Sequence, residues 1–304
     1  MNQPLVWILL LNYNRYDDTI ECVESIRNIS YINYKVLIVD NFSTDNSYRK
    51  LKNNFKDIEI IVTYDNLGYT GGVNYGIQHL KKYSPDYILL LNNDTIVTKS
   101  FLENLVETLD GNSKAAAACG TILCAHDQES IWYASGEIIR WRGLAVHFHK
   151  EKKFSSLNIR SSKKTDFITG CMILLKVKYL DAIGLEDDRF YMYLDDIEYS
   201  IRIQKKGFEL LYVYNSIIYH KVLGEKENPF KLYYSVRNRL LLITTSFSGV
   251  IKITAKFYFL IVIISKIIYW RFFNKLFYKA AIFGLIDYFK KKFYEGRGHL
   301  FYSE

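Results

Sequence analysis

A short apolar run that stops at three polar residues constrains the fold of this chain more than any other stretch. Residues 88–91 are Ile-Leu-Leu-Leu between polar neighbours, as in a fully buried strand of a parallel sheet that is covered on both faces. Asn92, Asn93 and Asp94 follow directly, so one carboxylate stands where the chain leaves the sheet. In open α/β sheets, ligands bind beyond the carboxyl ends of the strands. Asp94 is therefore a candidate ligand of Mg²⁺ or Mn²⁺, and such an ion would hold a diphosphate.

The same segment also has a structural explanation. Asn and Asp are common in turns, and Thr98 or Ser100 is suited to cap a following helix. Taken alone, the segment favours a turn. The rest of the chain changes this balance, because it supplies further polar residues at the ends of further strands.

Apolar runs and helical patterns alternate along the chain. Strands are predicted at residues 6–11, 36–39, 58–62, 115–120, 172–175, 210–213 and 217–219. Helices are predicted at residues 17–28, at 100–109 and from 195 to a stop at Gly207. Aromatic hairpins over the mouth of a site are expected within residues 121–148, and a mobile loop at 150–164. Alternating strands and helices form βαβ units, so we expect an α/β fold with a mostly parallel central sheet flanked by helices.

Residues 66–76 are rich in glycine and open a predicted helix. Glycine allows a close backbone approach, and a helix N-terminus favours anions. The pattern is not the GxGxxG fingerprint of nicotinamide enzymes, and no acid follows at the expected distance, which disfavours a dehydrogenase. Tight packing of the helix on the sheet is the alternative, because Gly72 and Gly76 share one helical face. The residues alone leave both explanations open.

Three acids, Asp195, Asp196 and Glu198, stand in the first turn of the helix predicted from residue 195. Acids at this position are favourable for the helix dipole, which is a sufficient structural reason for them. Two adjacent carboxylates and a third nevertheless exceed what capping requires, and a positioned Asp is a standard general base. His220 follows a predicted strand; a lone His is more often structural than a ligand.

Charge and cysteine content exclude several classes of protein. The chain of 304 residues carries a formal net charge of +8, and residues 250–304 hold ten Lys and Arg against three acids, a surplus of seven. The excess therefore belongs to the tail, which argues against a nucleic-acid partner. The four cysteines show no metal-ligand spacing and predict reduced thiols in a cytoplasmic protein, and residues 1–4 show no Ala-rich signal peptide.

The tail after residue 248 is apolar, aromatic and basic. Its apolar run at 257–264 is too short, and too close to Lys266, for an ordinary membrane span. Aromatic helices with Lys and Arg nearby are typical of membrane interfaces, and residues 290–292 and Arg297 add positive charge. A helical hairpin that forms a homodimer is the alternative. We expect a catalytic domain at 1–245, with a nucleotide-binding half (1–120) and an acceptor half (121–245), and a helical tail at 246–304.

Several motifs, taken in order, resemble the inverting nucleotide-sugar glycosyltransferases of family 2, which have the GT-A fold. The resemblance covers roughly residues 5–245 and is greatest to the bacterial branch with rhamnosyl- and galactofuranosyltransferases. No single match is strong, but the series is specific. It consists of Asn12-Tyr13-Asn14, Val39-Asp40-Asn41, Ser43-Thr44-Asp45, Asn66-Leu67-Gly68, Gly71-Gly72-Val73-Asn74-Tyr75-Gly76, Leu91-Asn92-Asn93-Asp94, Asp195-Asp196-Ile197-Glu198 with Arg202 and Gly207, His220-Lys221-Val222-Leu223-Gly224, Tyr233-Tyr234 and Arg237-Asn238.

The resemblance implies roles for these residues. Asp40 would bind the nucleobase, Asn41 or Asp45 would lie by the ribose, and Asn66 with the Gly71-Gly72 backbone would line the nucleotide and sugar. Apart from the resemblance, a lipid-diphosphate acceptor would let Arg237 and Arg239 help to bind a diphosphate of donor or acceptor, although solvation of their helix explains both residues nearly as well. The full expected donor set is Asn12, Asn14, Asp40, Asn41, Asp45, Asn66, Gly71, Gly72, Asn74, Asn93 and Arg237.

The resemblance also assigns the metal and the base. Asp94 and His220 would bind Mn²⁺ or Mg²⁺, and an imidazole ligand favours Mn²⁺. Asp196 matches the catalytic position, with Asp195 sharing or orienting its role. Acceptor contacts are expected from Glu198, Trp132 and Gly170. In one departure, Asn92 stands where the family usually has its first metal-site acid, although this branch often has Asn there.

The implied activity is transfer of a sugar from dTDP-rhamnose or a UDP-sugar to a hydroxyl of a growing cell-surface glycan that is held on a lipid. The enzyme would be cytoplasmic and peripheral on the inner face of the plasma membrane. A non-catalytic relative that binds sugar nucleotides or glycans is the alternative. It predicts loss of the acid at Asp94 or Asp196, and both are present.

Overall fold

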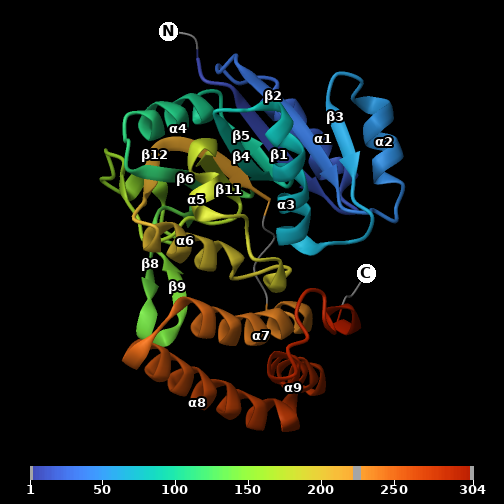
Figure 1. The fold of residues 1–304 in the computed structure, drawn as a ribbon, viewed down its shortest axis with the longest axis vertical. Coiled ribbons are helices and arrows are strands. Elements are labelled where there is room, and N and C mark those ends of the chain that lie inside the picture. Colours follow the sequence, from blue (N-terminus) through green and yellow to red (C-terminus); the bar gives the residue numbers. More distant parts are fainter. Residues whose placement is uncertain (1–2, 222–226, 302–304) are drawn as a thin grey trace.

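The computed structural model describes residues 3–221 and 227–301. In them a large sheet flanked by helices forms the upper layer, and three long helices lie beneath it (Figure 1). The strands are β1 (Val6–Asn12), β2 (Tyr34–Asp40), β3 (Glu59–Val62), β4 (Tyr87–Asn92), β5 (Thr95–Val97), β6 (Ala115–Cys124), β7 (Asp127–Tyr133), β8 (Gly136–Ile139), β9 (Leu144–His147), β10 (Lys163–Lys164), β11 (Met172–Lys176) and β12 (Glu209–His220). The helices are α1 (Tyr16–Ile26), α2 (Ser47–Asn54), α3 (Gly68–Leu80), α4 (Phe101–Asp110), α5 (Leu180–Ile183), α6 (Asp195–Lys205), α7 (Pro229–Ser246), α8 (Gly249–Phe273) and α9 (Lys275–Phe289).

The strands of the first half run parallel in the order β3-β2-β1-β4. Their apolar runs are buried in β1 and β4, as a parallel sheet covered by helices requires. The register sets Asn12 opposite Asp40 and Leu11 opposite Asn92. The polar ends of three strands therefore meet at one edge. The expected α/β fold is confirmed.

The second half of the sheet is mixed. β11 lies antiparallel between β4 and β6, while β6 and β12 are parallel. β12 is one long strand, so the two strands expected at 210–213 and 217–219 are wrong in number; its register with β6 shifts between Val213 and Ile217, which interrupts the apolar pattern. Residues 150–164, expected as a loop alone, contain a 3-10 turn at Phe154–Ser156 and strand β10.

Two glycines bring α3 close to the sheet. A Cβ atom at Gly76 would collide with the side chains of Leu9 and Val39, and a Cβ at Gly72 would lie 2.5 Å from Cδ1 of Leu11. The packing explanation for these glycines is therefore confirmed. The four cysteines are free, as expected, and three of them are buried.

The three C-terminal helices form their own layer (Figure 1). α9 packs along α7, and α8 packs against α7, α9 and the turn between β8 and β9. α8 buries Ala255, Phe259 and Ile263 on its inner side, whereas Phe257 and Phe272 are exposed. No helix among the described residues is both long enough and apolar enough to cross a bilayer.

Candidate active site

A hydrogen-bonded network joins the ends of three parallel strands. Asn12 at the end of β1 donates to Asp40 Oδ2 at the end of β2 (2.7 Å) and accepts from Thr19 Oγ1 (2.9 Å). Asn93, which follows β4, donates to the same Thr19 hydroxyl (2.8 Å). Ser43 donates from both N and Oγ to the Asp40 carboxylate. This network fixes the loops at the strand ends, where the donor is expected, and contact of these residues with a nucleotide stays a prediction.

A second set of contacts fixes the loop before α3. Asn41 Nδ2 donates to Asn66 Oδ1 and to the Gly68 carbonyl, both at 3.0 Å. Asn14 Oδ1 accepts from the backbone N–H groups of Thr44 and Asp45. The side-chain amides of Asn14, Asn41 and Asn66 thus hold the loops at the strand ends in a defined shape, beside the glycine-rich start of α3.

A cavity of about 800 Å³ lies beside the strand ends. Six residues expected at the site or its metal motif line it: Asn92, Trp132, Gly170, Asp195, Asp196 and His220. Asp94 lies against His220, with 3.1 Å between Asp94 Oδ1 and His220 Nε2. Residues far apart in the sequence, one from β4, one from α6 and one from β12, therefore converge on one cavity.

Asp94 and His220 fit the chemistry of a divalent-cation site. Burial alone would raise the pKa of Asp94, but the hydrogen bond and charge of His220, together with a backbone hydrogen bond and the charge of Arg15, bring this pKa below its usual value. Within residues 3–221 and 227–301, Asp94 Oδ1 and His220 Nδ1 are buried and lack a hydrogen-bond partner of good geometry. The same residues contain no group of three or more His, Cys, Asp or Glu able to hold a metal. An ion held by this pair would therefore need further ligands from a substrate or from water.

Asp195 and Asp196 begin α6 and also line the cavity. The buried Asp195 has its pKa raised to about 8, first by burial and then by the charge of Asp196. Burial also raises the pKa of Asp196, while its carboxylate accepts hydrogen bonds from the N–H groups of Gly170 (3.2 Å) and Ile197 (2.8 Å). Two adjacent buried carboxyl groups carry one negative charge between them more readily than they carry two negative charges. Asp195 therefore holds a proton near neutral pH, and Asp196 is the member that ionises.

The cavity also contains residues that the sequence patterns did not single out. His147 at the end of β9 lines it, donates from Nδ1 to the Trp132 carbonyl (2.8 Å), and lowers the pKa of Asp196 by its charge. Tyr69 lines it too and donates to the Gly170 carbonyl (2.7 Å). An isolated His in a hairpin carries no motif, so only the fold of β8 and β9 reveals its place.

Four expected contacts are corrected by the structure. Arg237 is fully buried and donates to backbone carbonyls, so it is not placed to bind a diphosphate. Arg239 donates to the Arg142 carbonyl (2.7 Å), away from the cavity.

Glu198 and Asn74 also serve the fold. Glu198 pairs with Arg202 one helical turn later (2.8 Å) instead of facing an acceptor. Asn74 exchanges hydrogen bonds with the backbone of Glu186, which ties α3 to the chain before α6. Residues 222–224 of the motif that begins at His220 lie outside the described residues.

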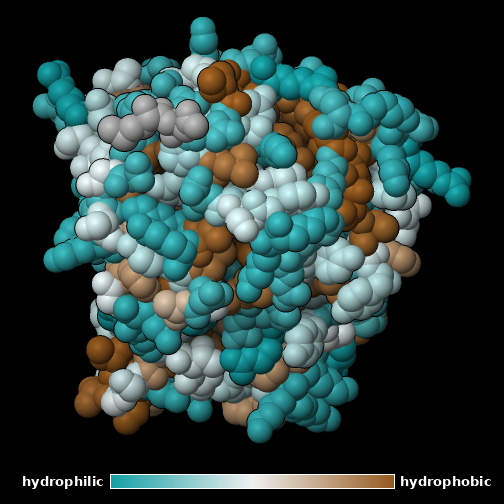
Figure 2. All heavy atoms as spheres, turned by 45° about the horizontal axis from the view of Figure 1, so that its top comes forward, coloured by the Kyte–Doolittle hydropathy of each residue, from teal (hydrophilic) through white to brown (hydrophobic). Residues whose placement is uncertain are grey.

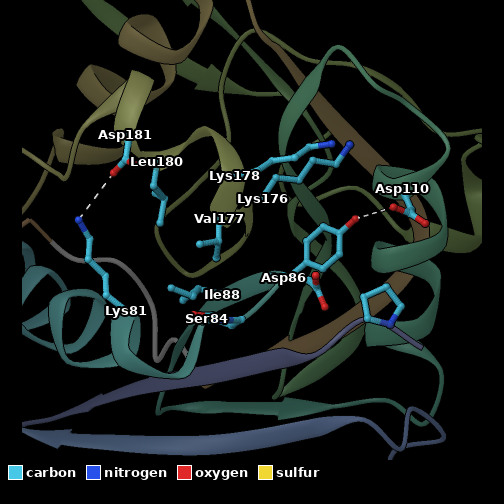
Figure 3. Close-up of a pocket in the computed structure, with 13 residues that line it drawn as sticks. Lys81, Ser84, Asp86, Ile88, Asp110, Lys176, Val177, Lys178, Leu180 and Asp181 are labelled. Carbon is cyan, nitrogen blue, oxygen red and sulfur yellow. Dashed lines mark hydrogen bonds and ion pairs between the residues drawn. The ribbon is translucent and has the colours of Figure 1, made fainter. Parts of the chain in front are cut away.

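A second cavity, of about 520 Å³, lies at the opposite ends of the strands (Figure 3). Lys81 and Asp181 form an ion pair across it, and Tyr87 donates to Asp110. Lys176 and Lys178 extend side by side in Figure 3, and Lys176 donates to the Asn112 carbonyl (2.7 Å). Acids balance the lysines here, so this cavity offers no excess charge for a ligand.

Comparison with known proteins agrees with this geometry. The hexosyltransferase Agl10 of low-salt glycan biosynthesis in Haloferax volcanii is 24% identical over 256 residues, which cover 79% of this chain and 76% of the relative. The N-acetylglucosaminyl-diphospho-decaprenol L-rhamnosyltransferase of Mycobacterium tuberculosis is 24% identical over 216 residues, or 64% of this chain and 69% of the relative. Both are named as sugar transferases.

A solved structure shares the fold. GalNAc-T7, crystallised with UDP, GalNAc and Mn²⁺, superposes with a TM-score of 0.63 at 16% identity. The match covers 77% of this chain and 48% of the GalNAc-T7 chain, so the present chain spans about half of that protein. The fold is therefore the GT-A fold. Residues 7–184, more than half of the chain, match the Glycosyl transferase family 2 domain. The protein belongs to glycosyl transferase family 2 and is a glycosyltransferase.

Proposed function

We propose that this enzyme transfers a sugar, with inversion, from dTDP-rhamnose or a UDP-sugar to a hydroxyl of a growing cell-surface glycan that is held on a lipid diphosphate. The observation that carries the proposal is the convergence of Asp196 and His220 on one cavity, with Asp94 against His220. The name of the mycobacterial relative, a rhamnosyltransferase acting on a diphospho-decaprenol, supports the choice of donor and acceptor.

The reaction needs one proton acceptor and one anion-stabilising group on opposite sides of the sugar. The acceptor oxygen attacks the anomeric carbon while the bond from that carbon to the diphosphate oxygen breaks, and the electron pair leaves with the nucleoside diphosphate. The Asp196 carboxylate takes the hydroxyl proton. Asp195 keeps its own proton and so leaves the single charge of the pair on Asp196. Direct displacement in this way inverts the anomeric centre.

Asp94 and His220 would hold Mn²⁺ or Mg²⁺ in this site. When bound, the cation offsets the charge that develops on the departing diphosphate. The lowered pKa of Asp94 keeps its carboxylate ionised and ready to bind a cation at neutral pH. Asn92, at the cavity wall, would offer a neutral oxygen where the family usually has an acid, so more of the ligands would have to come from substrate oxygens or water.

The donor loops at the strand ends complete the proposal. Asn12, Asn14, Asp40, Asn41, Asp45, Asn66 and Asn93, with the Gly71-Gly72 backbone, are proposed to shape the nucleotide site. Trp132 and Gly170 are proposed to contact the acceptor, because both line the cavity beside Asp196.

The experiment that tests this function is an assay with defined substrates. The protein is incubated with Mn²⁺ or Mg²⁺ and a panel of dTDP- and UDP-sugars, with a synthetic polyprenyl-diphosphate saccharide as acceptor. Release of the nucleoside diphosphate, together with glycan product of inverted anomeric configuration, is the expected result. Donor binding without turnover for every acceptor tested would instead favour a binding protein.

We further propose that α8 rests on the inner surface of the plasma membrane. Phe257, Ile268 and Phe272 are exposed on its outer side, and Lys256 and Arg271 lie nearby in the helix. An apolar strip bordered by basic residues matches an anionic lipid surface. Hydrophilic side chains cover most of the face in Figure 2. Hydrophobic ones gather in its upper right part and again at its lower left, and the lower left is the side where Figure 1 places the start of α8.

Vesicle binding tests this surface. Phe257→Glu with Phe272→Glu should abolish co-sedimentation with vesicles rich in anionic lipid. Ile32→Glu, which changes an equally exposed residue after α1 (82% exposed), should not. The wild-type protein could instead fail to bind the vesicles and form a dimer that the Phe257 and Phe272 changes dissociate. This result would contradict the membrane proposal and establish the homodimer.

A further inference from the structure

The turn just before the two catalytic-site carboxylates has an unusual backbone. Tyr191, Tyr193 and Leu194 have φ angles of 66°, 67° and 66°, in the left-handed region. Residues other than glycine rarely adopt this region, and three of them within four consecutive residues persist only where the surroundings impose it. Leu194 directly precedes Asp195, so the shape of the turn sets the direction in which α6 presents Asp195 and Asp196.

Two buried side chains of α7 hold this turn. Asn238 Nδ2 donates to the carbonyls of Phe190 (2.8 Å), Met192 (2.8 Å) and Tyr193 (3.0 Å). Arg237 Nη2 donates to the Phe190 carbonyl (2.9 Å), and its Nε donates to Asn238 Oδ1 (2.9 Å). Both side chains are 0% exposed. The Asn238 amide thus holds three carbonyls of one five-residue turn. A turn that is stable through hydrogen bonds among its own residues would not need such an outside partner.

The C-terminal segment, residues 287–297, contacts the other nitrogen of the Arg237 guanidinium. Arg237 Nη1 donates to the Tyr294 carbonyl (2.6 Å), and the N–H of Tyr294 donates to the Arg189 carbonyl beside the turn (3.2 Å). An ion pair between Asp287 and Arg297 (2.6 Å) closes this segment into a loop. The tail therefore reaches the active-site turn through direct hydrogen bonds.

The loop is also anchored to α7. Tyr233 donates to Asp287 Oδ2 (2.7 Å) and accepts from the N–H of Arg297 (2.8 Å). Gly296 has a φ angle of 57°, and a Cβ there would collide with Tyr233 and Arg237. Glycine is thus required at this position for the segment to enclose the guanidinium.

The turn contacts the donor side as well. The carbonyl of Tyr191 accepts from the N–H of Thr70 in the first turn of α3 (3.2 Å). The Tyr191 ring stacks on Tyr234 of α7 at 5.4 Å between centroids, and a Cβ on Gly68 would overlap it. The turn therefore lies between the glycine-rich segment and α7, and moving it would move the base relative to the donor.

We propose that Arg237 and Asn238 are positioning residues that hold the turn at 190–194, so that Asp196 faces the acceptor, and that residues 287–297 of the tail complete this support. The inference rests on the proposed role of Asp196 as base. It gives the tail a function inside the active site, separate from any contact of α8 with a membrane.

The main test is Asn238→Ala in the full-length protein, with Arg239→Ala as the matched control. Arg239 lies on the same helix and has a buried contact, but it holds the Arg142 carbonyl and not the turn. Asn238→Ala should lower kcat about 100-fold, the scale of a displaced reacting group, and leave binding of UDP or dTDP within about threefold. Hydrogen exchange should rise in residues 189–197 and stay unchanged in β1 and β4. Arg239→Ala should keep kcat within about threefold.

A second variant, Arg297→Ala, tests the tail. It should lower kcat in the same direction by about tenfold, since it opens the loop around Arg237 but leaves both α7 side chains in place. An Asn238→Ala enzyme with wild-type kcat would overturn the proposal. Equal losses of kcat and nucleotide binding, with exchange raised across the sheet, would also overturn it by showing a general loss of structure. Should Asp196→Asn prove fully active, the base assignment fails, while the exchange measurement still decides whether Asn238 holds the turn.

Discussion

The carboxyl groups of Asp94, beside His220, and of Asp195 and Asp196, at the start of α6, have pKa shifts of opposite sign. On one side, burial is outweighed by the hydrogen bond and charge of His220 together with a backbone hydrogen bond and the charge of Arg15, so the pKa of Asp94 is lowered. On the other, burial raises the pKa values of Asp195 and Asp196, and of the nearby Glu186, whose carboxylate oxygens have no hydrogen-bond partner among the described residues. One side is therefore prepared to attract a cation and the other to exchange a proton.

This difference shows how one fold separates the two tasks of a transferase. A carboxylate that binds a cation must stay ionised, which a neighbouring imidazole promotes. A carboxylate that accepts a proton must have a pKa closer to neutral, which burial beside a second acid provides. The elements that provide these neighbours are β12 for Asp94 and the start of α6 for Asp196.

Asp196→Asn gives the largest expected effect on the proton side. Loss of a general base costs about 10²- to 10⁴-fold, so kcat should fall by that amount while UDP or dTDP binding is kept. Steady-state kinetics and calorimetric nucleotide titration measure the two quantities. Asp181→Asn, at a side chain that is 97% exposed, is the control. Activity within threefold of wild type in the Asp196 variant would remove the distinction between the two sides.

Asp94→Asn tests the cation side. The neutral amide keeps the shape but lacks the charge, so apparent affinity for Mn²⁺ should fall by more than the roughly 10- to 100-fold seen when an outer partner of a metal ligand is lost. The measurement is Mn²⁺-dependent binding of UDP or dTDP. Asp57→Asn, on the surface beside Arg27, should leave the Mn²⁺ titration unchanged. An unchanged titration in the Asp94 variant would show that the metal, if used, binds elsewhere.

The smallest expected effect is on stability and concerns Asp195. Its pKa of about 8 exceeds the ordinary carboxyl value of 3.8, so the folded state binds the proton more tightly than the unfolded state. The stability that this proton contributes is complete below about pH 4 and is lost as the pH rises through about 8. Asp195→Asn should therefore raise the melting temperature at pH 9 by at least about 2–4 °C, the effect of about 1 kcal/mol in a domain of 150–250 residues.

The control for this prediction is the same comparison at about pH 3, below the unfolded-state pKa of 3.8. There Asp195 holds its proton in both the folded and the unfolded state and resembles Asn, so the two proteins should melt within about 1 °C of each other. Thermal unfolding followed by circular dichroism across about pH 3 to 9 gives both values. A difference in melting temperature that does not grow with pH would show that Asp195 is ionised in the folded protein.

Local pattern predicted the parts of the site that depend on strand ends. The apolar runs before Asn12, Asp40 and Asn92 ended where expected, because a parallel strand buried on both faces tolerates no polar residue until it leaves the sheet. Asp195 and Asp196 were likewise found from their place in the first turn of a helix. Their roles in binding and catalysis remain predictions.

The pattern failed for side chains whose partners lie far away in the sequence. Arg237 was expected at a diphosphate because a cation near a proposed site suggests a ligand, yet its partners are carbonyls of the turn before α6 and of the tail. His147 was missed because its hairpin carries no motif. Hydrogen bonds that span more than 40 residues leave no periodic signal.

The amino-acid sequence by itself determined the α/β fold and the positions of the acids, because strand burial, helix spacing and the order of motifs are local properties of the chain. Only the tertiary structure decided which acids keep a proton and which charged residues face the cavity. Those properties depend on burial and on neighbours such as His220 beside Asp94, and they exist only once distant segments have packed together.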